Sequence, residues 1–137
     1  HPTGARLLER QMSFVLLTVD LVELIHEEIL SANELQGLAA DKSLDGALAR
    51  IDNRMAFGMV DDVYSLAAAY AAAISQGHCF NDGNKRTAFQ AMDIVLDLNG
   101  VAISWDVDDV GARLIELAQS KIDEQEFASW LRALARG

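Results

Sequence analysis

An apolar segment near the middle of the chain reads Leu66-Ala67-Ala68-Ala69-Tyr70-Ala71-Ala72-Ala73-Ile74. A helix that is apolar on every side is typical of a buried helix. Its alanine side chains allow neighbouring helices to approach closely. Asp61 and Asp62 favour the start of this helix, because carboxylates stabilise a helix N-terminus. We expect it to run to about Gln76, with Gly77 as the glycine that follows its last turn.

Similar signals predict helices on both sides of this segment. Thr18 is a suitable N-cap for a first helix, in which Leu21, Ile25 and Ile29 recur at helical spacing. The sequence therefore predicts an all-α fold of about six helices, a compact bundle. The other expected elements are a loop over 33–42, a helix from Ser43 or Asp45 to about Arg54, a break at 57–59, a helix from about Asn84 to Asn99 ended by Gly100, a short extended piece over 101–103, a helix over 106–119, and a last helix from Asp123 with Glu126 as its capping-box partner.

Composition supports this fold class and limits the number of domains. The chain has 137 residues, of which 51% are apolar, enough for one domain with a core. The one proline is at position 2, so no proline interrupts the predicted helices. Residues 1–11 precede Met12 and are expected to be a cloning remnant or upstream read-through. The domain is then 12–137.

Charge and cysteine content exclude several classes of protein. The net charge of −10 argues against a general nucleic-acid or anionic-membrane binder. A single cysteine, Cys79, cannot form an internal disulfide and suits a reducing compartment. No apolar run of membrane-spanning length and no secretory pattern is present, so we expect a cytoplasmic protein.

The central helix is followed by His78-Cys79-Phe80-Asn81-Asp82-Gly83-Asn84-Lys85-Arg86. This segment lies where a new helix is predicted to start, and free backbone N–H groups there make a ready anion site. Lys85 and Arg86 oppose the helix dipole, a cost that a bound anion would offset. The chemistry indicated is phosphate binding beside a base.

The polar residues of this segment have distinct expected roles. His78 is a candidate general base, because an unperturbed imidazole takes up a proton near neutral pH. Asp82 is a candidate Mg²⁺ ligand, since Mg²⁺ commonly takes one or two carboxylates plus substrate phosphates. Gly83 brings a backbone N–H close to a phosphate oxygen. His26, by contrast, is interpreted as a packing residue.

The segment 78–86 resembles the signature of the Fic/Doc family, His-x-Phe-x-(Asp/Glu)-(Gly/Ala)-Asn-(Gly/Lys)-Arg, and most closely its Doc branch. The likeness extends from 50–54 through Gly77 to 99–100. It implies a Fic/Doc-type helical bundle with a short flap, expected around Arg50 to Gly58, that aligns a target protein by strand pairing.

The resemblance also implies roles for residues of the motif. His78 would deprotonate a target hydroxyl, and Asp82 would hold Mg²⁺ on the phosphates of ATP. An anion hole would form from Gly83, Asn84 and Arg86 with the loop amides. Phe80 would pack the loop into the core.

Two departures from the Fic pattern bear on the reaction. Lys85 replaces a second glycine, and Phe89 replaces a second arginine. In the Doc branch this lysine accompanies a reversed orientation of the nucleotide, so that the γ-phosphate faces the target hydroxyl. The resemblance therefore implies phosphorylation of a threonine of translation elongation factor Tu, a modification that stops protein synthesis. Gly83 matches the Fic pattern, so AMP transfer stays an alternative, as does a catalytically silent interaction module.

The resemblance further implies a toxin of a type II toxin–antitoxin module. The self-inhibitory motif (Ser/Thr)-x-x-x-Glu-(Gly/Asn) has no match; the nearest is Ser120…Glu124, followed by Gln125. We therefore expect inhibition by a separate Phd-like antitoxin, whose disordered tail would fold into a helix across an apolar groove.

Overall fold

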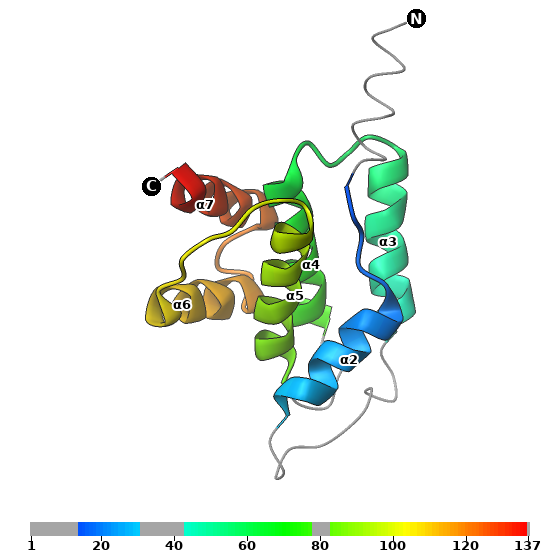
Figure 1. The fold of residues 1–137 in the computed structure, drawn as a ribbon, viewed down its shortest axis with the longest axis horizontal. Helices are drawn as coiled ribbons and strands as arrows, with labels where there is room; N and C mark the ends of the chain where they lie inside the picture. The colour runs from blue at the N-terminus through cyan, green and yellow to red at the C-terminus, as the bar shows by residue number, and fades with distance from the viewer. Residues whose placement is uncertain (1–13, 31–42, 78–82, 137) are drawn as a thin grey trace, which may run out of the picture.

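The computed structural model describes residues 14–30, 43–77 and 83–136. These residues form α-helices and no strand, so the all-α prediction is confirmed. Figure 1 shows α4 and α5 side by side at the centre, with α2 and α3 on one side and α6 and α7 on the other. The described helices are α2 (Val19–Ile29), α3 (Leu44–Ala56), α4 (Val63–Gly77), α5 (Asn84–Leu98), α6 (Val107–Ala118) and α7 (Glu124–Arg136).

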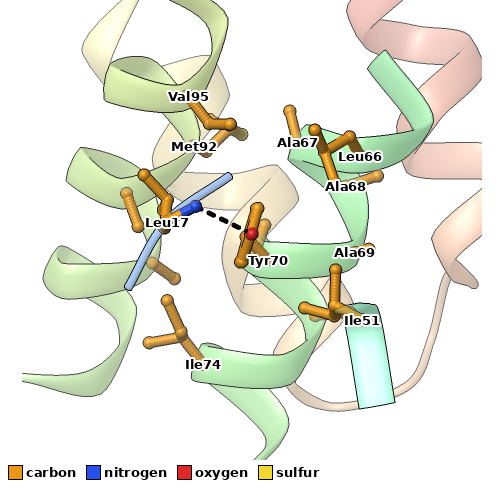
Figure 2. Packing of buried hydrophobic residues seen from close by; sticks show 14 of the residues in the cluster. Leu17, Ile51, Leu66, Ala67, Ala68, Ala69, Tyr70, Ile74, Met92 and Val95 are labelled. Carbon is orange, nitrogen blue, oxygen red and sulfur yellow. Dashed lines mark hydrogen bonds between the residues drawn. The ribbon is translucent and has the colours of Figure 1, made fainter. Parts of the chain in front are cut away.

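The alanine-rich helix α4 is the centre of the core, as predicted. It contacts α3, α5, α6 and α7, and the residues from Leu66 to Ala72 are buried without exception. Figure 2 shows Ile51 of α3 and Met92 and Val95 of α5 around this helix. The alanine side chains of α4 leave room for larger apolar side chains from the neighbouring helices, so the core around α4 is closely packed.

A buried phenol joins the N-terminal segment to α4. The hydroxyl of Tyr70 accepts a hydrogen bond of 2.9 Å from the backbone N–H of Leu17 (Figure 2). Burial raises the pKa of Tyr70 to about 12, although the hydrogen bond from Leu17 acts in the opposite direction. Nearby, the side chain of Asn99 pairs with both the N–H and the carbonyl of Val15. The segment that leads into α2 is therefore fixed on the core.

Side-chain caps begin most of the helices where the sequence predicted them. Thr18 accepts from the N–H of Leu21, and Ser43, rather than Asp45, accepts from Gly46. Before α7, Asp123 and Glu126 form the predicted capping box, in which each carboxylate accepts from the other residue's N–H, at 2.7 and 3.3 Å. Asp62 caps α4 by accepting from Ser65, and Asp106 caps α6 by accepting from Asp109.

Three helices end in the same left-handed turn. After α5, Gly100 has φ +86°, and the N–H groups of Gly100 and Val101 bond back to Asp97 and Leu96, as in a Schellman motif. Gly58 (φ +69°) ends α3 in the same way. At the end of α6 the left-handed position is occupied by Ser120 (φ +58°), where a glycine would be less strained.

Two ion pairs attach α7 to the last turn of α3 and to the connection between α3 and α4. Arg54 of α3 forms a two-pronged pair with Glu124, and Arg132 donates to Asp62 at 2.6 and 3.2 Å. Burial acts to raise the pKa of Asp62, but hydrogen bonds from Arg132 and Ser65 outweigh it and hold the pKa below its usual value. The side chains of both pairs are partly exposed, so each pair contributes little to the free energy of unfolding.

The prediction of a flap around Arg50 to Gly58 was wrong. Arg50 and the residues up to Ala56 belong to α3, and Phe57 and Gly58 form the turn that ends it. The segment is helical because apolar residues recur along α3 at helical spacing, and they form one stripe that is buried against the core. The stripe consists of Leu44, Ala47, Leu48, Ile51 and Met55. Residues 101–103, expected as a short extended piece, lie in the non-helical connection between α5 and α6.

Other expectations differ only at their edges or fall outside the description. Gly77 is the last residue of α4 rather than the first beyond it. The loop expected over 33–42 and the sequence before Met12 lie outside the described residues. Within the described part, no helix combines the length and apolar character needed to cross a bilayer.

The strained turn after α6 gives a direct test of this geometry. Replacing Ser120 with glycine should raise the free energy of unfolding by about 1 kcal/mol, since an L-residue in the left-handed region costs about that much. Denaturant unfolding monitored by circular dichroism measures the change. Ser120→Ala is the matched control, because it removes the hydroxyl but keeps the strain. A glycine variant no more stable than the alanine variant would contradict the account.

Candidate functional site

The motif lies where α4 ends and α5 begins, at the end of the bundle where α2 also ends (Figure 1). His78 and Asp82, the predicted base and the predicted metal ligand, lie outside the described residues, as does Phe80. Their roles therefore stay predictions. The described part of the motif comprises Gly83, Asn84, Lys85 and Arg86, which form the cap and first turn of α5.

Gly83 is the N-cap of α5 and has left-handed backbone angles, φ +78° and ψ +18°. Its carbonyl accepts from the N–H of Thr87 at 2.9 Å, which starts the helical hydrogen-bond pattern. With no side chain, this cap offers no acceptor to the first-turn N–H groups, unlike the caps at Thr18 and Ser43. The arrangement fits a helix start whose N–H groups serve an anion.

The last turn of α2 packs directly behind this glycine. A Cβ atom at position 83 would lie 3.1 Å from Cδ2 of Leu30 and 3.6 Å from both Cδ2 and Nε2 of His26. His26 is 1% exposed, so its predicted role in packing is confirmed. Its packing partner, however, is the motif itself, which no spacing within the sequence indicated.

The same turn of α2 also holds Arg86. The guanidinium donates a hydrogen bond of 3.2 Å to the carbonyl of Ile29, the last residue of α2. Carbonyl groups at a helix C-terminus carry the negative end of its dipole, so they are a favourable partner for a cation. α2 thus contacts the motif at two points one helical turn apart, Gly83 and Arg86.

Lys85 and Arg86 are both exposed on the first turn of α5, and the half-buried Asn84 precedes them. In the described residues, two cationic side chains and the positive end of α5 therefore lie together on a chain of net charge −10. This combination fits phosphate groups and does not fit a cation. No group of three or more His, Cys, Asp or Glu residues suited to a metal occurs in the described ranges, so the Mg²⁺ prediction depends on Asp82.

An apolar groove begins beside the two cations. It has a volume of about 330 Å³ and runs between α5 and α6, with Lys85 and Arg86 on its border. Two of its residues are well exposed, Val107 (77%) and Ile115 (45%). The residues of this groove could not be assigned from the sequence, because the α6 positions follow the motif by more than twenty residues. Its apolar lining is Ile29, Phe89, Val107, Val110, Leu114 and Ile115.

Phe89 explains one departure from the Fic pattern in structural terms. Its ring lines the groove and meets Trp105 edge to face, with ring centroids 5.5 Å apart. Trp105 in turn donates from Nε1 to Asp93 at 2.9 Å. An aromatic ring at position 89 therefore belongs to a packed cluster, where an arginine reaching for phosphates would not fit without losing these contacts.

The geometry of Gly83 predicts the effect of a side chain there. Gly83→Ala should lower the free energy of unfolding by about 1 to 2 kcal/mol, because the residue keeps a positive φ and its Cβ would crowd Leu30. Thermal or denaturant unfolding measures it. Gly111→Ala is the matched control: a Cβ there meets nothing within 4 Å, and helix propensity predicts a gain of up to about 1 kcal/mol. Equal effects at both positions would contradict the prediction.

Comparison with known proteins shows similarity over the region of the chain that contains the motif. A sequence model of the Fic/DOC family matches residues 16–96, which include α2, α3, α4, the motif and most of α5. The chain is also 29% identical over 115 residues to "Protein kinase doc" of Escherichia phage P1, covering 84% of this chain and 90% of the phage protein. The chain belongs to the Fic/DOC family, and its similarities place it in the Doc branch.

Proposed function

We propose that this protein is the toxin of a toxin–antitoxin module and transfers the γ-phosphate of ATP to a hydroxyl of a target protein. The observation that carries the proposal is the Doc-type motif with a lysine, Lys85, exposed on the first turn of α5. The similarity to a phage protein named as a protein kinase supports it. The proposed site of action is the cytoplasm.

The described part of the motif suits the phosphates of ATP. The glycine cap leaves the first-turn N–H groups without a side-chain acceptor from position 83, and Lys85 and Arg86 add positive charge. Asn84 would complete this anion site. When bound, Mg²⁺ held by Asp82 would neutralise charge on the phosphate oxygens.

The proposed reaction is a direct transfer. His78 takes the proton of the target hydroxyl, the hydroxyl oxygen forms a bond to the γ-phosphorus, and the bond from that phosphorus to the bridging oxygen breaks to release ADP. Phosphoryl transfer asks mainly for positioning and charge neutralisation, so a domain of this size is sufficient.

Protein AMP transfer is the second candidate, because Gly83 is the residue of the Fic pattern at its position. Two observations favour γ-phosphoryl transfer over it. Lys85 replaces the glycine that makes room for the phosphates in the AMP-transferring pose, and Phe89 lies in an aromatic cluster where the second arginine would stand. A catalytically silent module is disfavoured by the complete motif.

The proposed target is a threonine of translation elongation factor Tu, and the proposed effect is arrest of translation and growth. Incubation of purified elongation factor Tu with the protein and Mg-ATP, followed by mass spectrometry, separates the candidates. We expect a gain of one phosphoryl group. A gain of AMP would favour the second candidate, and no change in any host protein would favour the silent module.

A variant of the base tests the same reaction in cells. His78→Ala should abolish growth arrest on expression and lower transfer by about 10² to 10⁴-fold, the usual contribution of a general base. Its helical circular dichroism should stay that of the parent protein. A toxic His78→Ala variant would exclude the general-base role.

We also propose that a Phd-like antitoxin inhibits the protein by placing a helix in the groove between α5 and α6. The groove is apolar along its length, and Lys85 and Arg86 at its border would attract an acidic side chain of the partner. A segment bound there would also lie beside the anion site, so binding and inhibition would be one event.

Two exposed groove residues allow this interaction to be tested without disturbing the core. The double substitution Val107→Asp with Ile115→Asp should weaken antitoxin binding by a factor of 100 or more, since a buried apolar contact costs about 1 to 3 kcal/mol to lose at each position. Co-expressed antitoxin should then fail to prevent growth arrest, while transfer activity is retained.

Leu98→Asp is the matched control, because Leu98 is similarly exposed (47%) and does not line the groove. It should leave protection by the antitoxin intact. Full protection of cells that carry the double variant would show that the antitoxin binds another surface.

A further inference from the structure

His26 occupies the buried face of α2, where its neighbours along the helix are apolar. Val22 and Ile25 share this face, and His26 is as buried as they are. An imidazole carries two polar nitrogen atoms, and removing polar atoms from water costs free energy unless they find a partner. A leucine would fill a similar place at lower cost. The presence of histidine at this position therefore calls for a polar role.

The orientation of the His26 ring indicates which part of the protein it contacts. Its Cδ2–Nε2 edge faces the N-cap of α5, since both atoms lie 3.6 Å from the position of a Cβ on Gly83. That cap has no side chain of its own and has left-handed backbone angles. The polar edge of this buried ring is thus directed at Gly83, the one residue of the motif that has no side chain with which to contact its neighbours.

The surroundings make α2 a rigid support for this contact. Val22 and Ile25 anchor the helix in the core, and the carbonyl of Ile29, one residue before Leu30, accepts from Arg86. α2 also packs against α5. A displacement of the cap of α5 would therefore have to move against the last turn of α2.

We propose that His26 is a positioning residue of the phosphate-binding turn, acting through the Nε2 edge of its ring on the Gly83 cap. The inference rests on the proposed function, because it assumes that this turn binds the phosphates of ATP. His26 itself does not touch the nucleotide or the reacting atoms. It sets the position of the backbone N–H groups at the start of α5, and a misplacement of about 1 Å is enough to lower turnover about 100-fold.

Three substitutions at position 26 separate a polar role from simple packing. His26→Leu keeps the apolar volume and removes both nitrogens. His26→Gln places a polar atom near the position of Nε2, and His26→Asn places one near Nδ1 only. We expect the leucine variant to be at least as stable as the parent but to bind Mg-ATP about 10- to 100-fold more weakly, the range typical of residues that orient a binding group. The glutamine variant should keep most of the affinity, and the asparagine variant should not.

The measurements are the dissociation constant for Mg-ATP, by titration calorimetry, and the melting temperature of each variant. Val22→Ala is the matched control, since it weakens the same helix at a buried position away from Gly83: it should lower stability and leave Mg-ATP affinity unchanged. A leucine variant that binds Mg-ATP within about twofold of the parent would overturn the proposal. If the leucine variant does not fold, asparagine binding as well as glutamine would overturn it.

This design keeps the two proposals distinguishable. A parent protein that binds Mg-ATP but modifies no target would refute the proposed function alone, and the ratio of dissociation constants would still decide the role of His26. A parent protein that neither binds Mg-ATP nor arrests growth would refute both.

Discussion

The structure depends on the burial of one slender helix on all of its sides. Because α4 presents small side chains to α3, α5, α6 and α7, each of these helices can approach it closely and bury its own larger apolar residues there. The contribution of α4 lies less in its own methyl groups than in the space that it leaves for Ile51, Met92 and Val95. A larger residue at any of its buried alanines would push neighbouring helices apart rather than fill a gap.

The candidate site follows from this arrangement, since the motif joins the end of the most buried helix to the start of its closest neighbour. α4 delivers the chain to one end of the bundle, and α2 ends at the same place. The last turn of α2 then touches Gly83 with its side chains and Arg86 with a backbone carbonyl. A helix C-terminus facing a helix N-terminus places opposite dipole ends together, which helps to keep the cationic turn in place.

Local signals in the sequence were good predictors of local structure. Thr18, Ser43 and the Asp123–Glu126 pair cap helices as expected, because a cap is decided by residues a few positions apart. The all-round apolar character of α4 correctly indicated its burial. The family motif placed Gly83, Asn84, Lys85 and Arg86 at a helix start, where the structure has them.

Features that depend on packing between distant segments were not predictable in this way. The contact between His26 and Gly83 joins positions far apart in the chain, and the groove combines α2, α5 and α6. The flap expected around Arg50 to Gly58 was wrong because it rested on position in the family pattern alone, whereas the apolar stripe of α3 continues the predicted helix to Ala56. His78 and Asp82 stay predictions.

The position of α7 against α4 has a consequence for the newly made chain. α7 begins roughly 50 residues after α4 ends, a distance that a ribosome covers in about 3 to 10 s. During this interval the side of α4 that α7 will cover is exposed, and the ion pairs of Glu124 with Arg54 and of Arg132 with Asp62 cannot yet form. The nascent chain therefore exposes apolar surface of α4 until α7 is made, and the interface between α4 and α7 is among the last parts of the core to form.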